Sequence, residues 1–255
     1  MDHKQTVKLV FTQAADSYAA RKAGVDRLSH WWMLKLSQVG HGDRVLDVAT
    51  GPGFIALRFA ERAKQVVGVD LTPAFVAKAQ ASAAERGLTN IGFREGDVEN
   101  LPFANGSFDI VTCHKALHHF PDAERALVEM HRVLKQGGRL VLGDTRSSDD
   151  PETARRHNEL ERLRDPSHVE MYGPLKLQAL VKRAGFHIER VEQFEDEKEI
   201  NWWQQVMPAP ESVYSEIRQR LIASIPEDML GLSVRLEGDK IFFRRRHLVL
   251  AAVKG

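Results

Sequence analysis

Short apolar runs alternate with longer amphipathic segments through the middle of the chain, from Arg44 to Asp144. The runs read RVLDVA, QVVGVD, IGFREGD, FDIVTC and RLVLGD, and segments such as FIALRFAERA separate them. Strands that alternate with helices pair in parallel, because each helical crossover returns the chain to the same end of the sheet. The pattern predicts an α/β fold with a mostly parallel, seven-stranded sheet and helices on both faces.

Helix-like segments flank this region and interrupt the strands that follow it. Apolar positions at helical spacing predict two N-terminal helices, over residues 6–22 and 26–38. Polar helical inserts are expected over 150–164 and 199–239, and the strand-like runs HIERVEQF and HLVLAAV follow them. We expect one domain over residues 1–255, divided into an N-terminal helical cover (1–42), a ligand-binding core (43–145), and a part that completes the sheet and carries substrate-cover inserts (146–255).

The composition says more about possible binding partners than about the fold. The 36 Lys and Arg residues nearly balance the 35 Asp and Glu residues, so no nucleic-acid partner is expected. The sequence lacks an apolar run of about 18 residues, which predicts no membrane span and a cytoplasmic protein. We expect a monomer or a homodimer.

A glycine-rich segment, DVATGPG, follows the first predicted strand. Glycines let a ligand approach the backbone, and the following helix N-terminus offers free N–H groups. Read as Gly51-x-Gly53-x-x-Ala56 with Asp70 further on, the segment also fits the fingerprint of an NAD(P)-dependent oxidoreductase. Asp47 would repel a pyrophosphate and attract a cation, which favours a sulfonium cofactor over NAD.

Five ordered motifs make the resemblance specific: VLDVATGPG, VVGVD, FREGDVENLPF, SFDIVTCHKALHHF and VLKQGGRLVLGD. Together they resemble the Rossmann-like class I S-adenosylmethionine-dependent methyltransferases, especially the ubiquinone/menaquinone-biosynthesis-like group. The later segment LRDPSHV resembles bacterial members of that group other than the quinone enzymes. The resemblance implies a cytoplasmic enzyme that methylates a small-molecule substrate, with C- or O-methylation favoured.

The resemblance also implies a cofactor site. The loop would wrap the methionine part of S-adenosylmethionine while Asp47 holds the loop and the ammonium group. Asp70 would accept the ribose hydroxyls, or alternatively cap the following helix, and Asp97 would accept from the adenine amino group. The complete expected set is Tyr18, Asp47, Ala49, Thr50, Gly51, Pro52, Gly53, Asp70, Leu71, Gly96, Asp97, Val98 and Lys115.

Two adjacent histidines are the candidates for acid–base chemistry. If the acceptor is a phenol, an enol or an acidic carbon, His119 or His118 could remove its proton beside the methyl donor, and His119 is the first choice. No metal is expected, because these histidines lack an HExxH spacing or an acidic cluster. The acidic run 195–199 and the arginines 244–246 are expected to be solvated strand edges outside the site. A non-catalytic S-adenosylmethionine-binding module remains the alternative from another functional class.

Overall fold

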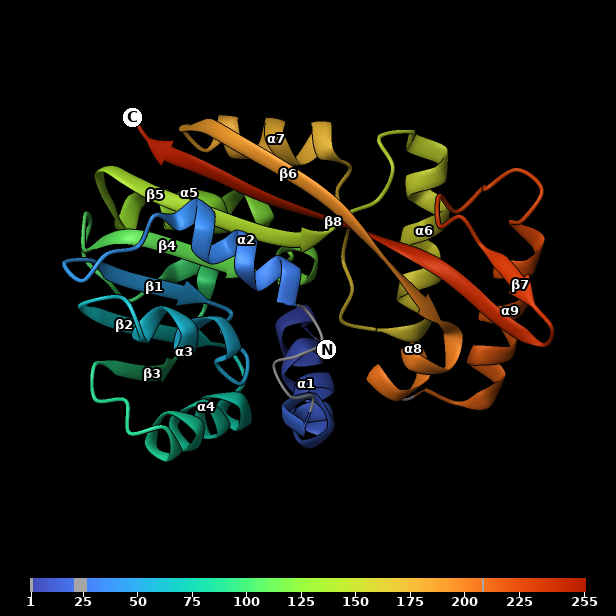
Figure 1. The fold of residues 1–255 in the computed structure, drawn as a ribbon, viewed down its shortest axis with the longest axis horizontal. Coiled ribbons are helices and arrows are strands. Elements are labelled where there is room, and N and C mark those ends of the chain that lie inside the picture. The colour runs from blue at the N-terminus through green and yellow to red at the C-terminus, as the bar shows by residue number, and fades with distance from the viewer. Residues whose placement is uncertain (1, 21–26, 208) are drawn as a thin grey trace.

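The computed structural model describes residues 2–20, 27–207 and 209–255. A twisted sheet forms its centre, in the order β3-β2-β1-β4-β5-β8-β6, with the short β7 paired to β8 alone (Figure 1). β1 to β5 run parallel, and β8 runs antiparallel to both of its long neighbours. The strands are β1 (Arg44–Val48), β2 (Gln65–Asp70), β3 (Ile91–Glu95), β4 (Phe108–His114), β5 (Leu134–Thr145), β6 (Phe186–Glu199), β7 (Arg235–Glu237) and β8 (Lys240–Lys254).

Helices cover both faces of this sheet and extend beyond its edge. They are α1 (His3–Ala20), α2 (Arg27–Ser37), α3 (Phe54–Ala60), α4 (Pro73–Glu85), α5 (Ala123–Val133), α6 (Pro151–Arg164), α7 (Pro174–Arg183), α8 (Ile200–Val206) and α9 (Glu211–Ala223), with short 3-10 turns η1 (Val98–Asn100) and η2 (Leu117–His119). Residues 21, 22 and 26, at the expected ends of the first two helices, lie outside the described residues.

The core has two layers because side chains alternate across the strands. Leu140 and Leu142 pack with α5 and α7 on one face, whereas Val141 packs with α2, α3 and α4 on the other. This burial on both faces explains the nearly continuous apolar runs of the central strands. The predicted α/β sheet is confirmed, with one strand more than the seven expected, because the second insert contains the three-residue β7.

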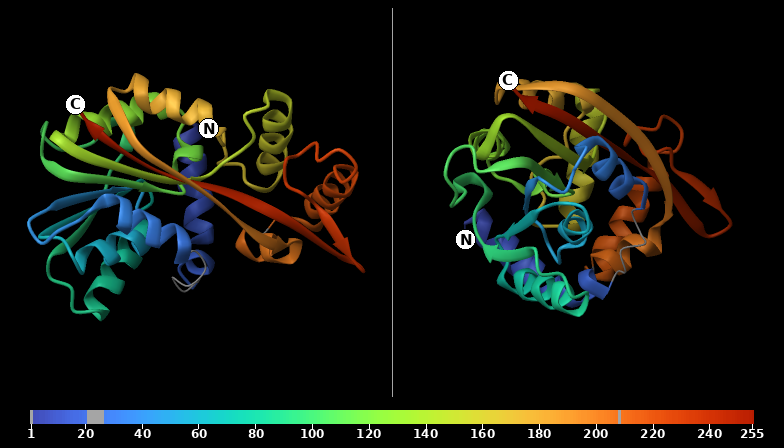
Figure 2. Two further views of the ribbon diagram at one scale, coloured as in Figure 1. Left: turned by 45° about the horizontal axis from the view of Figure 1, so that its top comes forward. Right: turned by 60° about the vertical axis from the view of Figure 1, so that its left-hand side comes forward.

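A third apolar cluster forms a cap beyond the sheet. β6 and β8 continue past the other strands as a long two-stranded ribbon, and α6, α8 and α9 pack around its far end (Figure 2). Trp203, Tyr214 and Phe243 lie buried in this cluster. The two inserts expected from the sequence therefore share a small core of their own, which stands beside the carboxyl ends of the parallel strands.

The two charge runs face each other across this ribbon. Asp196 is the register partner of Arg245, and its carboxylate accepts hydrogen bonds from that guanidinium and from His247. The Arg245 guanidinium also stacks over Trp202, 4.2 Å from the ring centroid. The expectation that both runs lie outside the site is wrong for Arg245, which stacks on Trp202 and lines a cavity shared with the glycine loop.

Candidate active site

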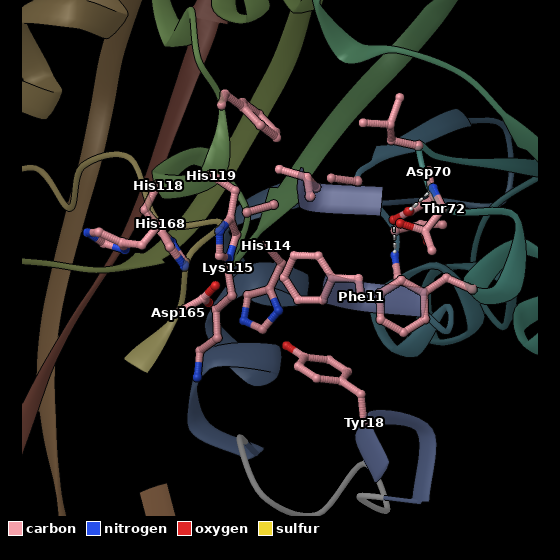
Figure 3. Close-up of a pocket in the computed structure, with 18 of the residues that line it drawn as sticks. Phe11, Tyr18, Asp70, Thr72, His114, Lys115, His118, His119, Asp165 and His168 are labelled. Carbon is pink, nitrogen blue, oxygen red and sulfur yellow. Dashed lines mark hydrogen bonds between the residues drawn. The ribbon is translucent and has the colours of Figure 1, made fainter. Parts of the chain in front are cut away.

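A cavity of about 260 Å³ opens where the loops after β1, β2, β3 and β4 meet α1 and the cap. Ligands bind at this edge of parallel sheets because the carboxyl ends of neighbouring strands converge there. In Figure 3, His118 and His119 of η2 and His168 of the α6–α7 loop lie on one side, Asp70 and Thr72 on the other, and His114 of β4 lies between them with Phe11 and Tyr18 of α1.

The glycine loop carries left-handed backbone at alternate positions, with φ of 50° at Ala49, 55° at Gly51 and 86° at Gly53. A Cβ atom at Gly51 would meet nothing within 4 Å, so this residue leaves open space beside the cavity. A Cβ atom at Gly53 would lie 3.1 Å from the side chains of Ala79 and Phe93. Gly51 therefore shapes the ligand space, whereas Gly53 permits close packing of α3 against α4 and β3.

Asp47 is buried directly beneath the loop. Its carboxylate accepts hydrogen bonds from the hydroxyl groups of Thr50 and Thr112, each at 2.6 Å. Burial raises its pKa to about 6, although these hydrogen bonds oppose the rise. A carboxylate that water does not solvate gains charge stabilisation from a nearby cation, so this position suits a cationic ligand.

Asp70 links the loop after β1 to the loop after β2. Its two carboxylate oxygens accept hydrogen bonds from the backbone N–H groups of Gly51, at 2.7 Å, and Thr72, at 2.8 Å. Burial raises its pKa, against the effect of these donors. Thr72 is the N-cap residue of α4 and makes no side-chain capping bond, and Asp70 holds the Thr72 backbone N–H just ahead of the helix and does not bond its first turn. Asp70 also lines the cavity.

Asp97 connects the cavity to α1. Lys4 lies with its ammonium 2.7 Å from the Asp97 carboxylate and 2.5 Å from that of Glu99. These two carboxylates raise the pKa of Lys4, although partial burial acts in the opposite direction. The N-terminal helix is therefore held over the β3 end of the cavity by ion pairs as well as by the aromatic contacts of Phe11 and Tyr18 with Phe75.

The residues predicted from the sequence converge on this one cavity. All of the predicted cofactor residues line it except Gly53, and both predicted histidines line it as well. Lys115 has a left-handed φ of 52°, and its backbone N–H donates to the Gly143 carbonyl at 2.7 Å.

His118 and His119 occupy different environments although they are adjacent in η2. His118 Nδ1 lies 2.7 Å from an Asp144 carboxylate oxygen, and this carboxylate raises the pKa of His118 despite its burial. Burial, together with charge on the nearby His118, lowers the pKa of His119 to about 4. His119 Nδ1 hydrogen-bonds the Ser167 carbonyl at 3.0 Å. His118 is therefore the more basic imidazole, and His119 stays neutral.

Asp144 was not among the residues that the sequence singled out. It ends the last parallel strand, where its buried carboxylate is held by the backbone N–H of Thr145 at 2.8 Å as well as by His118. Burial opposes its charge, but His118 outweighs this effect and lowers the pKa of Asp144. Its position at a strand end was a usable signal, because acids there face the ligand edge of the sheet.

The cap contributes a second group of cavity residues that the sequence did not identify. Together with the α6–α7 loop, it supplies Glu161, Arg164, Asp165, His168, Met171, Trp202 and Trp203. Arg164 pairs with Glu161 at 2.5 Å and stacks over the Trp203 ring, 4.9 Å from its centroid. Within the described ranges, no cluster of His, Cys, Asp and Glu has the arrangement of a metal site, and no helix is long and apolar enough to cross a membrane.

Comparison with known proteins places this site in a family. The methyltransferase domain family matches residues 46–142. The chain is 41% identical over 159 residues to the YcgJ methyltransferase of Bacillus subtilis, covering 62% of this chain and 63% of that protein. It is 34% identical to the protein YafE of Escherichia coli, covering 62% of this chain and 77% of that protein. It is 48% identical over 101 residues to a demethylmenaquinone methyltransferase of Thermus thermophilus, covering 39% of this chain and 46% of that protein.

Comparison with solved structures points to the same relatives as the sequence comparison. The crystal structure of Bacillus subtilis YcgJ superposes with a TM-score of 0.85 at 32% identity, covering 89% of this chain and 97% of that chain. The sequence matches span less than two thirds of the length of YcgJ and of the Thermus enzyme. The five motifs and the converging acids belong to the matched region, and the structural similarity extends to the cap. The chain belongs to the class I S-adenosylmethionine-dependent methyltransferases.

Proposed function

We propose that this protein transfers the methyl group of S-adenosylmethionine to a small organic acceptor that carries an acidic O–H or C–H group. The relatives named for menaquinone biosynthesis support a small-molecule acceptor, and one of them is named a C-methyltransferase. The single observation that carries the proposal is the position of His118, which lines the same cavity as the glycine loop and the strand-end acids and is hydrogen-bonded from behind by Asp144.

The cavity fits the proposed cofactor in shape and in charge. The open space at Gly51 admits a ligand against the backbone, and the buried Asp47 favours the cationic methionine end. Asp70 and Leu71 would hold the ribose, and Gly96, Asp97 and Val98 the adenine. Tyr18 would cover the cofactor, and the backbone at Lys115 would border its sulfonium end. When bound, the cofactor supplies an electrophilic methyl carbon for in-line displacement, a reaction in which alignment provides much of the acceleration.

His118 is the proposed general base. Asp144 fixes the Nδ1–H tautomer of His118, so the Nε2 lone pair is available to the acceptor, and the Asp144 carboxylate stabilises the imidazolium that forms when the proton arrives. His119 is the weaker candidate, although it was the first choice from the sequence. An imidazole with a pKa of about 4 takes up a proton poorly near neutrality, so His119 would border the methyl acceptor without exchanging a proton.

Two measurements test this function. Calorimetric titration with S-adenosylmethionine, S-adenosylhomocysteine and NADH should give saturable binding of the first two and none of NADH. Incubation with methyl-tritiated S-adenosylmethionine and a panel of phenols, hydroquinones and 1,3-dicarbonyl compounds should then transfer label to at least one acceptor. Binding of NADH alone would favour the oxidoreductase, and cofactor binding without transfer to any acceptor class would favour the non-catalytic module.

A further inference from the structure

His168 lies beside His118 on the same side of the cavity, with 5.6 Å between the two ring centroids (Figure 3). It belongs to the loop between α6 and α7, beyond the region that the family match covers. The backbone ties this loop to the β4 exit, because the Val169 and Glu170 N–H groups donate to the His118 carbonyl at 2.8 and 3.1 Å. The position of His168 relative to the proposed base is therefore fixed by hydrogen bonds.

The hydrogen bonds of Asn158 determine which nitrogen of His168 carries the proton. Asn158 is buried, and its amide NH₂ donates to the carbonyls of Ala154, at 2.9 Å, and Met171, at 3.1 Å. Its Oδ1 atom accepts from the Met171 N–H at 2.7 Å, so the amide cannot be reversed without losing these bonds. His168 Nε2 lies 2.7 Å from the same oxygen and must therefore donate to it.

The other ring nitrogen of His168, Nδ1, then carries an unprotonated lone pair. With Nε2 protonated, the neutral ring has Nδ1 as its acceptor. Among the described residues, the hydrogen bonds leave Nδ1 without a protein partner, and the residue lines the cavity. Burial lowers the pKa of His168 to about 3, with a further contribution from His118, so the ring stays neutral across the physiological range. Water or a ligand in the cavity must therefore supply the donor, because an acceptor left without one costs free energy.

We infer that His168 is a specificity-determining residue, whose Nδ1 accepts a hydrogen bond from an O–H or N–H group on the methyl acceptor. The inference rests on the proposed function. The group that His168 recognises lies close to the reacting atom, because the rings of His168 and of the proposed base are 5.6 Å apart. An acceptor with an ether or carbonyl oxygen at that place is disfavoured, because two lone pairs then face each other. The enzyme thus selects acceptors that carry a second donor group beside the methylated position.

The tautomer can be measured on the unliganded protein. In ¹⁵N-labelled protein, the two ring nitrogens of His168 should give the widely separated resonances of a neutral imidazole protonated at Nε2, unchanged between pH 5 and 8. A protonated Nδ1, or titration of the ring near its ordinary pKa, would overturn the inference. The Asn158→Leu variant should allow both tautomers of His168. The spectrum of the unmodified protein is sufficient to identify the native tautomer.

Binding of two small probes tests the recognition. Phenol carries one O–H donor, and fluorobenzene is nearly the same size without a donor. With S-adenosylhomocysteine present, phenol should shift the Nδ1 resonance of His168 and bind roughly two- to tenfold more tightly than fluorobenzene, the range for one net hydrogen bond. His168→Leu should remove the preference for phenol and keep fluorobenzene binding. The control is His187→Leu, at an exposed position of β6, which should keep the preference for phenol.

The outcomes separate the inference from the proposed function. If the unmodified protein does not bind S-adenosylhomocysteine, the methyltransferase function is contradicted. The titration with phenol and fluorobenzene can still be carried out on the protein alone. Normal S-adenosylhomocysteine binding with equal affinity for phenol and fluorobenzene, or a phenol shift confined to His118, contradicts the role of His168 alone.

Discussion

The Asp70 carboxylate accepts a hydrogen bond from the Gly51 backbone N–H at 2.7 Å, so the acid at the end of β2 holds the glycine loop that follows β1. Its other oxygen accepts from Thr72 at 2.8 Å. One side chain thereby fixes the two backbone segments between which the ribose of the proposed cofactor would lie. Asp70 serves the structure before any ligand binds.

Replacing Asp70 should therefore affect both stability and binding. Asp70→Asn places an NH₂ group against one of two backbone donors, and such a lost bond to a charged acceptor costs about 1–3 kcal/mol in the free energy of unfolding. S-adenosylmethionine affinity should fall by a similar free energy. Denaturant unfolding and calorimetry measure the two effects. Asp97→Asn is the control, since Asp97 is partly exposed and should change stability less. An Asp70→Asn protein with normal affinity would contradict the ribose assignment.

The two loop glycines should respond differently to alanine. Gly51→Ala adds a methyl group in open space, so the fold pays only the left-handed strain of roughly 1–2 kcal/mol while cofactor binding is lost. Gly53→Ala has the same kind of strain and also presses on Ala79 and Phe93, so its melting temperature should fall further. Thermal unfolding and cofactor titration of both variants give the comparison. Equal destabilisation would mean that the contacts at Gly53 relax freely.

The pH dependence of turnover should report the His118–Asp144 pair. A base must be neutral to act, and Asp144 raises the pKa of His118, so activity should rise with pH through a value above 6.5. Asp144→Asn should move this acidic limb to lower pH and reduce turnover. His118→Gln should remove the limb and lower the maximal rate by roughly 10²–10⁴-fold.

His119→Asn serves as the matched control for these profiles. The pKa of His119 is lowered to about 4, so its replacement should leave the acidic limb near its original position. If His119→Asn abolishes the limb while His118→Gln keeps it, the assignment of the base is reversed. If neither variant changes the limb, another group titrates in it and neither histidine is the base.

Stability should fall as the solution is acidified, in part through His168. Its pKa is about 3 in the folded protein and near 6.5 when unfolded, so between these values the unfolded chain binds the extra proton. The contribution is full above 6.5 and is lost as the pH falls toward 3, with a slope of up to ~1.4 kcal/mol per pH unit. Asp47, with its raised pKa, acts in the opposite direction below pH 6.

Comparison with a variant isolates the contribution of His168 to the pH dependence of the free energy of unfolding. The free energy of unfolding of His168→Leu, measured by denaturant at several values between pH 4 and 7, should depend less steeply on pH than that of the unmodified chain. His187→Leu should keep the original slope. Parallel curves for the unmodified protein and His168→Leu would show that His168 titrates normally in the fold.

The sequence by itself determined the features that depend on neighbouring residues. The alternation of apolar runs and helices predicted the parallel sheet, because side-chain periodicity and helical crossovers are local properties. The glycine loop was found from its residues and its place after a strand, whereas the roles expected for Asp70 and Asp97 came from the resemblance of the ordered motifs to the methyltransferase family. The cap helix α6 was also predicted, and Asp150 caps it by accepting from the Thr153 N–H at 2.8 Å.

Only the tertiary structure decided how the histidines differ. Asp144 lies 26 residues from His118, and Ser167 lies 48 residues from His119, so the two imidazoles receive opposite environments from segments distant in the chain. The tautomer of His168 likewise follows from Asn158 on α6 and the carbonyls around it. A pKa or a tautomer reflects burial and the geometry of partners, and neither is encoded in the spacing of residues along a strand or helix.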